Sequence, residues 1–233
     1  MDRMLQTLKE GLPVLGLDLP AETAETLCRF GQAVVKQNEV MNLTAITEPD
    51  QVARLHLLDS LSVLKAADLA GKRLIDVGCG AGFPGVPVKI GCPEADVTLL
   101  DSLGKRMAWL ERILPELGVQ ATCVTARAEE HAATCRETFD YATSRAVARL
   151  NILLELTAPF VKVGGAVLAM KGVAAREELA EAKVAIEKLG LHLEQVLDFP
   201  VDGTAHSVIV LRKVKPTPPK YPRAYAKIKK IPL

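Results

Sequence analysis

From residue 72 onward, short apolar runs alternate with amphipathic stretches. Five runs rich in branched apolar residues predict buried strands, near residues 73–77, 96–101, 120–126, 139–144 and 164–170. A helical stretch follows each run. The clearest begins after Asp101, with Ser102 as the expected N-cap and a stripe of five apolar residues: Leu103, Met107, Leu110, Leu114 and Leu117. This alternation predicts an open α/β sheet with helices on both faces.

The two ends of the chain follow different patterns. Residues 21–41 and 50–66 carry apolar positions at helical spacing, which predicts a helical N-terminal cap. After Gly172 we expect a polar helix over 174–189, then two strands near 191–199 and 206–213. The short turn at Asp202-Gly203 predicts that these strands close the sheet as an antiparallel hairpin. We therefore divide the chain into a cap (1–70), a sheet core (71–213) and a tail (214–233).

Composition limits the class of protein. The chain has 233 residues, of which 49% are hydrophobic, enough for one domain of ordinary size with an extension. Its five cysteines are scattered, with no C-x-x-C pair and no nearby histidine at ligand spacing, so we expect free thiols and no metal site. No leader or long apolar stretch is evident. We expect a soluble cytoplasmic protein without membrane contact.

Charge is distributed unevenly. The formal net charge is +1, but residues 212–233 hold eight basic residues and no acid, and the remainder carries a formal net charge of −7. A basic tail on an acidic body is typical of an arm that meets polyphosphate, although a solubilising terminus would look similar. Tyr221 and Tyr225 lie among these charges and could stack on unpaired bases, which favours RNA as the partner.

The most informative motif is a glycine-rich turn after the first predicted strand. An apolar run ending in Asp76 leads into Gly78, Gly80 and Gly82, a strand-turn-helix arrangement that cradles nucleotide-like cofactors. Gly80-x-Gly82-x-x-Gly85 also fits the dinucleotide fingerprint, and Asp101 stands near the distance expected for a ribose-binding acid. The pattern alone therefore leaves the cofactor open.

The charge of Asp76 favours one cofactor. A carboxylate at the mouth of the turn would repel the pyrophosphate of a dinucleotide, whereas S-adenosylmethionine has no phosphate and carries an ammonium and a sulfonium. We therefore expect S-adenosylmethionine. In the plainer alternative, Asp76 is a solvated acid at a strand end and the glycines only form a turn. The closing hairpin agrees with the first interpretation, because it is usual in methyltransferase sheets and unusual in dinucleotide domains.

Further candidates follow the other strands, because ligands of open α/β sheets bind beyond the carboxyl ends of the strands. Asp101, after the second strand, can accept hydrogen bonds from both ribose hydroxyls. Ala128 and Glu129, after the third, could read the adenine edge through a backbone amide and a carboxylate. Glu129 could equally be a helix cap.

The segment after the fourth strand faces the transferable methyl group. It reads Thr143-Ser144-Arg145-Ala146, without the Asn/Asp-Pro-Pro-aromatic motif of amino-group methyltransferases or the cysteine of cytosine-C5 enzymes. An acceptor that needs no deprotonation fits this segment, and guanine N7 is one. Arg145 cannot act as a base, but its fork matches a guanine edge, a phosphate or a cofactor carboxylate; a structural salt bridge is the alternative. Lys171, after the fifth strand, is a candidate RNA contact.

Several strings together resemble one family, the bacterial 16S rRNA guanine-N7 methyltransferases (RsmG, glucose-inhibited division protein B). The resemblance runs from the second predicted helix to the last residues. The Asn-Leu-Thr and Asp-Ser-Leu-Gly-Lys-Arg strings are its most specific parts. The matching segments are 41–46, 56–60, 76–84, 100–106, 144–146, 171–172 and 221–223.

The resemblance implies a Rossmann-like class I methyltransferase sheet, S-adenosylmethionine as cofactor, and a guanine in a decoding-region loop of 16S rRNA, or of the small ribosomal subunit, as substrate. It also implies cofactor contacts at five positions: Gly78, Phe83, Ala128, Glu129 and Arg145. The tail departs from the family pattern, with Ala224, Ala226 and Ile228 in place of a lysine, a glycine and a proline. Its charge is kept, and we expect four RNA contacts there: Arg223, Lys227, Lys229 and Lys230.

We therefore expect an S-adenosylmethionine-dependent enzyme that methylates guanine N7 in 16S rRNA by direct in-line transfer, without a general base or a metal. A small-molecule methyltransferase with the same cradle is the first alternative, and the basic tail and 4% aromatic content count against it. A non-catalytic RNA-binding protein that keeps the cradle is the second. A nicotinamide oxidoreductase comes last. His56 and Asp59 share a helix face, where a structural hydrogen bond explains them at least as well as catalysis.

Overall fold

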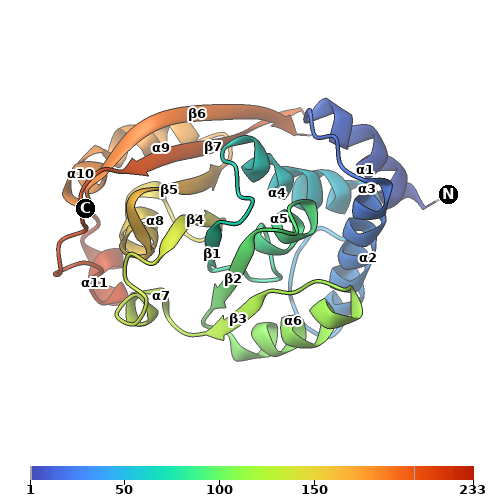
Figure 1. The fold of residues 1–233 in the computed structure, drawn as a ribbon, viewed down its shortest axis with the longest axis horizontal. Helices are drawn as coiled ribbons and strands as arrows, with labels where there is room; N and C mark the ends of the chain where they lie inside the picture. The colour runs from blue at the N-terminus through green and yellow to red at the C-terminus, as the bar shows by residue number, and fades with distance from the viewer. Residues whose placement is uncertain (1, 202) are drawn as a thin grey trace.

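The computed structural model describes residues 2–201 and 203–233. Within them, the centre is a seven-stranded sheet in the order β3-β2-β1-β4-β5-β7-β6 (Figure 1). The strands are β1 (Arg73–Val77), β2 (Asp96–Asp101), β3 (Thr122–Thr125), β4 (Phe139–Arg145), β5 (Val161–Lys171), β6 (Leu191–Val201) and β7 (Thr204–Lys213). Strands β1 to β5 pair in parallel, whereas β7 runs antiparallel to both β5 and β6. The predicted sheet with its closing antiparallel hairpin is confirmed.

The N-terminal segment is helical, as predicted, and includes a first helix that the sequence did not single out. It consists of α1 (Arg3–Val14), α2 (Ala21–Asn38), α3 (Pro49–Val52), a π-helical segment η1 (Ala53–Leu58), α4 (Asp59–Leu61) and a 3-10 segment η2 (Ser62–Lys65). The widened π-helical turn is uncommon and is often found at functional sites. It carries His56, from one of the family-like strings.

The remaining helices connect the strands. They are α5 (Gly85–Gly91), α6 (Gly104–Glu116), α7 (Ala128–His131), α8 (Leu150–Thr157), the 3-10 turn η3 (Ala158–Phe160), α9 (Ala175–Glu181), α10 (Lys183–Lys188) and α11 (Tyr225–Lys230). The single helix predicted over 174–189 is therefore two helices, with a break at Ala182. Of the predicted turn Asp202-Gly203, Asp202 lies outside the described residues.

Two hydrophobic clusters cover the two faces of the sheet. The alternation along β1 is typical: Leu74 joins a cluster with α2, α5 and α6, and Ile75 joins the opposite cluster with α8 and α10. The N-terminal helices contribute Leu8, Leu27 and other residues to the first of these clusters. The predicted N-terminal cap therefore shares its core with the sheet rather than forming a core of its own.

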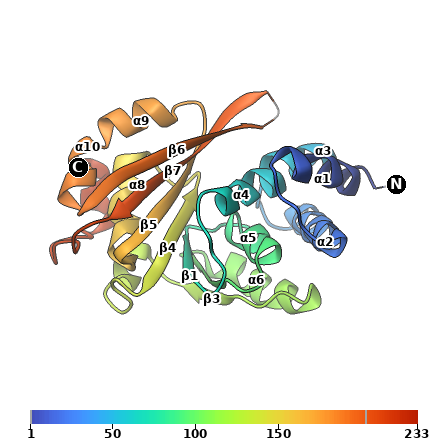
Figure 2. The same ribbon diagram turned by 45° about the horizontal axis from the view of Figure 1, so that its top comes forward.

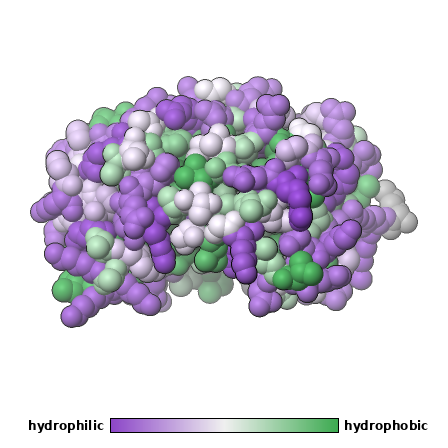
Figure 3. All heavy atoms as spheres, turned by 90° about the horizontal axis from the view of Figure 1, so that it is seen from below, coloured by the Kyte–Doolittle hydropathy of each residue, from purple (hydrophilic) through white to green (hydrophobic). Residues whose placement is uncertain are grey.

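The β6–β7 hairpin extends beyond the parallel strands toward the N-terminal helices, as two views show (Figures 1 and 2). His206 near its tip bonds Asp59 of α4, which ties the last strand to the first third of the chain. The two termini lie at opposite ends of the molecule. Seen from below, the surface is mostly hydrophilic, with paler and apolar areas near the centre (Figure 3).

Candidate cofactor and acceptor site

The backbone of the glycine-rich turn after β1 packs closely against neighbouring segments. Gly78 has φ +74°, and a Cβ atom there would lie 2.5 Å from Cγ2 of Val147. Its N–H donates to the carbonyl of Leu100 at 2.7 Å, so the turn is fixed against the end of β2. Gly80 also has positive φ, +57°. Both positions require a conformation that side chains disfavour, which explains the glycines the sequence singled out.

Asp76 lies beneath this turn rather than at its open mouth, where the sequence placed it. The side chain is fully buried, and its Oδ2 accepts a hydrogen bond from the N–H of Gly85, at the start of α5, at 2.7 Å. Its Oδ1 has no hydrogen-bond partner among the described residues. Burial raises the pKa of this carboxyl group to about 7. The cradle therefore holds an incompletely satisfied acid, a feature that a cationic or hydrogen-bonding ligand would stabilise.

Asp101 links the glycine turn to α6. Its Oδ2 accepts from the N–H of Gly80 at 2.9 Å, and its Oδ1 accepts from the N–H of Leu103 at 2.8 Å. The side chain is largely buried. Because each carboxylate oxygen has a second lone pair, both can still accept from a ligand hydroxyl.

A cavity of about 400 Å³ opens beside this turn. Four predicted cofactor residues from different segments line it together: Gly78, Asp101, Ala128 and Glu129. Tyr225 of α11 lines it too, which the sequence did not reveal as a cofactor-site position. Asp76, Gly80 and Phe83 do not line this cavity, and Arg145 lines a neighbouring one.

Arg145, at the end of β4, is held by the N-terminal helices. Its Nη1 donates to the carbonyl of Leu55 at 2.8 Å and to Oδ2 of Asp59 at 2.9 Å. Its guanidinium also lies over the ring of Phe83, 5.0 Å from the centroid. The ion pair is mostly buried, so the fork is oriented before any ligand arrives. The structural salt bridge that the sequence left open is therefore present.

His56 is a neutral member of the same cluster. Nδ1 of His56 lies 3.1 Å from Nη2 of Arg145 and 3.1 Å from the carbonyl oxygen of Leu55, and Nε2 lies 2.7 Å from Oγ1 of Thr44. Burial, followed by the charge of Arg145, lowers the His56 pKa to about 4. Both ring nitrogens are occupied, which supports a structural role for this histidine.

A second cavity, of about 650 Å³, adjoins the first, and Ala146 and Val147 line both. Ala146 has φ +56°, which is unusual for a residue with a side chain and marks local strain at this shared wall. His206 faces the same cavity and bonds Oδ1 of Asp59 through Nδ1 at 2.8 Å. That hydrogen bond is the main reason its pKa is raised.

Lys171 and Glu178 form another wall of the second cavity. Nζ of Lys171 donates to the carbonyl of Ala148 at 2.5 Å and pairs with Oε2 of Glu178 at 2.9 Å. The predicted RNA contact at Lys171 is thus a mostly buried ammonium that faces a cavity rather than an open surface.

The tail divides into an anchored part and an exposed part. Arg223 bonds the buried carboxylate of Glu155 through its N–H, Nε and Nη2, at 2.9, 2.7 and 2.6 Å. Lys227, Lys229 and Lys230 on α11 are exposed. Tyr221 is 5% exposed and packs in the core, so the expectation that its ring stacks on RNA was wrong.

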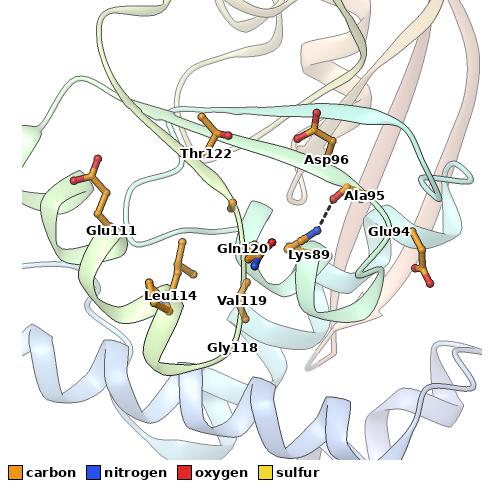
Figure 4. A pocket seen from close by; sticks show the side chains of 12 residues that line it. Lys89, Glu94, Ala95, Asp96, Glu111, Leu114, Gly118, Val119, Gln120 and Thr122 are labelled. Carbon is orange, nitrogen blue, oxygen red and sulfur yellow. Dashed lines mark hydrogen bonds between the residues drawn. The ribbon is translucent and has the colours of Figure 1, made fainter.

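A further cavity, of about 750 Å³, lies at the amino ends of β2 and β3 (Figure 4). Its lining includes Glu94, Glu111 and Gln120, and the ammonium of Lys89 in it bonds the carbonyl of Ala95 at 2.8 Å. Because cofactors of such sheets bind at the carboxyl ends of the strands, this cavity is not the cofactor site.

Sequence reasoning missed His206 and Glu178. The hydrogen bond between His206 and Asp59 joins residues 147 positions apart, and Glu178 reads in the sequence as one acid on a polar helix. Within residues 2–201 and 203–233, no cluster of three or more His, Cys, Asp or Glu could hold a metal. No helix in this part of the chain is long and apolar enough to cross a membrane.

Comparisons of the sequence with known proteins find one family. The model of the family described as GidB, rRNA small subunit methyltransferase G, matches residues 23–205. A relative named Ribosomal RNA small subunit methyltransferase G, from Alkaliphilus oremlandii (strain OhILAs), is 44% identical over 232 residues, 97% of each chain. A relative of the same name, from Desulfitobacterium hafniense (strain Y51), is 44% identical over 90% of this chain and 89% of its own.

Solved structures share the fold at low identity. M. jannaschii TYW2 in complex with AdoMet superposes with a TM-score of 0.55 at 14% identity, covering 67% of this chain and 77% of that one. Precorrin-6y C5,15-methyltransferase from Geobacter metallireducens GS-15 gives a TM-score of 0.51 at 13% identity, covering 74% and 92%. The fold is that of the class I S-adenosylmethionine-dependent methyltransferases.

Proposed function

The chain belongs to the rRNA small subunit methyltransferase G family, and on that premise we propose that it transfers the methyl group of S-adenosylmethionine to N7 of one guanine in 16S rRNA. The observation that carries the proposal is the pair of adjoining cavities at the carboxyl ends of the strands, which share a wall at Ala146 and Val147. One cavity suits the cofactor and the other an acceptor base. The activity implies small-subunit rRNA in the bacterial cytoplasm as the partner.

The residues around the first cavity fit the cofactor. Asp76, beneath the glycine turn, has a buried carboxylate oxygen with no hydrogen-bond partner among the described residues, which favours positive charge nearby. Gly78 allows close backbone approach, and Asp101 retains lone pairs for ribose hydroxyls. Ala128 and Glu129 line the same cavity, which supports their proposed contacts with the adenine edge. When bound, S-adenosylmethionine supplies a methyl group on a positively charged sulfur.

The protein's own contribution is orientation. Arg145 is fixed by Asp59 and Leu55 and stacks on Phe83, so one wall of the second cavity is rigid before the substrate arrives. Ser144 is buried, and its hydroxyl donates to the carbonyl of Val77 at 2.7 Å, so it cannot reach a substrate. Guanine N7 carries a lone pair and no proton, and this arrangement suits such an acceptor.

A proton-abstraction mechanism would depend on His206. Its Nδ1 bonds Asp59, and its Nε2 makes no hydrogen bond within the described part of the chain. This resembles the orientation of a general base by a carboxylate. A base must be neutral to accept a proton, and the pKa of His206 is raised above its ordinary value, so such a rate would climb with pH above 6.5.

Single-turnover methylation of small ribosomal subunits, with saturating cofactor, separates the two mechanisms. We expect a rate that stays nearly level from about pH 6 to pH 8.5, both in the wild type and in His206→Asn, because N7 needs no base. His56→Gln should behave in the same way. A rate that climbs with pH in the wild type and loses that climb in His206→Asn would show that the acceptor atom is not N7.

A further inference from the structure

Lys171 and Glu178 are a mostly buried ion pair in the wall of the second cavity. Their side chains are 7% and 14% exposed. Lys171 ends β5, and Glu178 lies on α9, whose backbone packs near β7 and α8. Oε2 of Glu178 accepts both from Nζ of Lys171 at 2.9 Å and from the N–H of Leu150 at 2.7 Å. These two bonds fix the orientation of the carboxylate.

The pair keeps unused hydrogen-bonding capacity. The ammonium of Lys171 has three N–H groups, of which Ala148 and Glu178 take two. Oε1 of Glu178 has no hydrogen-bond partner in the described residues, and it is not among the fully buried unsatisfied atoms. Because both residues line the second cavity, its wall presents one donor beside one acceptor.

A donor beside an acceptor discriminates between the purines. Guanine presents the acceptor O6 along the same edge as its 2-amino donor, whereas adenine presents a 6-amino donor and the acceptor N1. The Lys171–Glu178 pair therefore complements guanine and opposes adenine. An adenine here would set its amino group against the ammonium, which costs more than a missing hydrogen bond.

The position of the pair in the sheet agrees with this assignment. The first cavity lies over the end of β1, and β4 separates β1 from β5 in the sheet order. Lys171 and Glu178 therefore stand on the side of the second cavity away from the cofactor cavity. In guanine the 2-amino group lies across the ring system from N7, so a base with N7 toward the cofactor turns its 2-amino group toward this pair.

We infer that Glu178 is a specificity-determining residue that accepts a hydrogen bond from the 2-amino group of the acceptor guanine, with Lys171 holding its carboxylate in place. The inference rests on the proposed function. Leu55 and Met170 add apolar surface to the same cavity, which suits the faces of a base. A charged acceptor is the stronger kind of hydrogen-bond partner for a neutral amino group.

Inosine at the methylated position tests this directly, since it lacks only the 2-amino group. Small subunits are reconstituted with rRNA that carries guanine or inosine there, and kcat/KM is measured for each. We expect the wild type to methylate the inosine substrate about 10- to 100-fold less efficiently, the usual effect of losing a hydrogen bond to a charged group. In Glu178→Gln this penalty should fall to within about threefold, because the amide can turn a donor toward the cavity.

The control is Glu177→Gln, on the same helix, where the side chain is 67% exposed and pairs with Arg149. It should keep the full inosine penalty. The penalty is the ratio of kcat/KM for the guanine and inosine substrates within one variant, so a loss of protein stability does not mimic the effect. Glu178→Asp provides a second variant, in which the carboxylate is retracted. An equal penalty in the wild type and Glu178→Gln would overturn the inference. A wild type that fails to methylate guanine N7 would instead overturn the proposed function.

Discussion

At the scale of single residues, the structure shows that ionising Asp76 of the glycine-turn motif costs folding free energy. Asp76 is fully buried, and one of its oxygens lacks a partner in the described residues. Its pKa is raised from 3.8 to about 7, mainly by burial. A group whose folded-state pKa is raised in this way is bound more tightly to its proton in the folded protein. Stability is therefore lost as the pH rises from about 4 to about 7.

We expect Asp76→Asn to stabilise the cofactor-free protein relative to the wild type, increasingly so with pH. A difference of about three pKa units corresponds to about 4 kcal/mol of unfolding free energy. The variant should gain this amount relative to the wild type between about pH 4 and pH 7, and the difference should stay constant above that range. Urea unfolding at pH 5, 6, 7 and 8 measures this trend. Calorimetry on the same variant should show weaker binding of S-adenosylmethionine.

A difference in unfolding free energy that is the same at every pH would reflect only the new amide. The test is therefore whether the difference grows with pH. If the difference in unfolding free energy does not grow with pH, Asp76 is not a costly buried charge, and its assignment to a cationic cofactor loses its physical basis.

The position of Arg145 in the site could be predicted from the sequence, but its partners could not. The candidate position was visible because it follows a strand in an open α/β sheet. Its partners were not, because Leu55 and Asp59 lie 90 and 86 positions away on a π-helical turn and a short helix. The hydrogen bond between Asp59 and His206 extends the same network to the last strand. Pairings over such separations leave no local signal.

At the scale of elements, the tail is the clearest departure from expectation. Its basic residues look alike in the sequence, yet Arg223 is bound to the buried carboxylate of Glu155, whereas the lysines of α11, like Lys215 and Lys220, are exposed. Tyr225 lines the first cavity, and Ile228 is buried. Removing the tail would therefore change the wall of the first cavity as well as the charge of the tail, so charge substitutions give the cleaner experiment.

We expect Lys227→Gln, Lys229→Gln and Lys230→Gln together to weaken RNA binding while leaving cofactor affinity unchanged. If all three lysines contact phosphate, the slope of log affinity against log salt should fall by about 0.7 per contact, up to about 2 in total. The measurement is filter binding of small-subunit rRNA at about 50 to 300 mM salt, a range over which screening of exposed charges increases.

A matched control replaces three exposed lysines elsewhere, Lys72, Lys183 and Lys188. This triple variant should keep the wild-type slope. Equal slopes for the wild type and the α11 variant would mean that α11 does not contact the RNA.

At the scale of the whole molecule, hydrophobic periodicity determined most of what could be predicted. The strands and the closing hairpin follow from short apolar runs, whose residues face the two clusters alternately. The cap was visible as helices, but its shared core with α5 and α6 was not. Most of the wall of the first cavity could be assembled from strand ends, although Tyr225 of α11 was missed, whereas the second cavity combines residues of the cap, β5, α9 and β7.

Direct mapping of the transferred methyl group tests the central claim. Small ribosomal subunits from cells that lack this protein are incubated with the purified protein and isotope-labelled S-adenosylmethionine, and the rRNA is analysed by mass spectrometry and by chemical cleavage at N7-methylguanosine. We predict a single labelled methyl group, on N7 of one guanine in 16S rRNA. Label on another atom or base, or no label in the rRNA from a protein that binds the cofactor, would contradict the account.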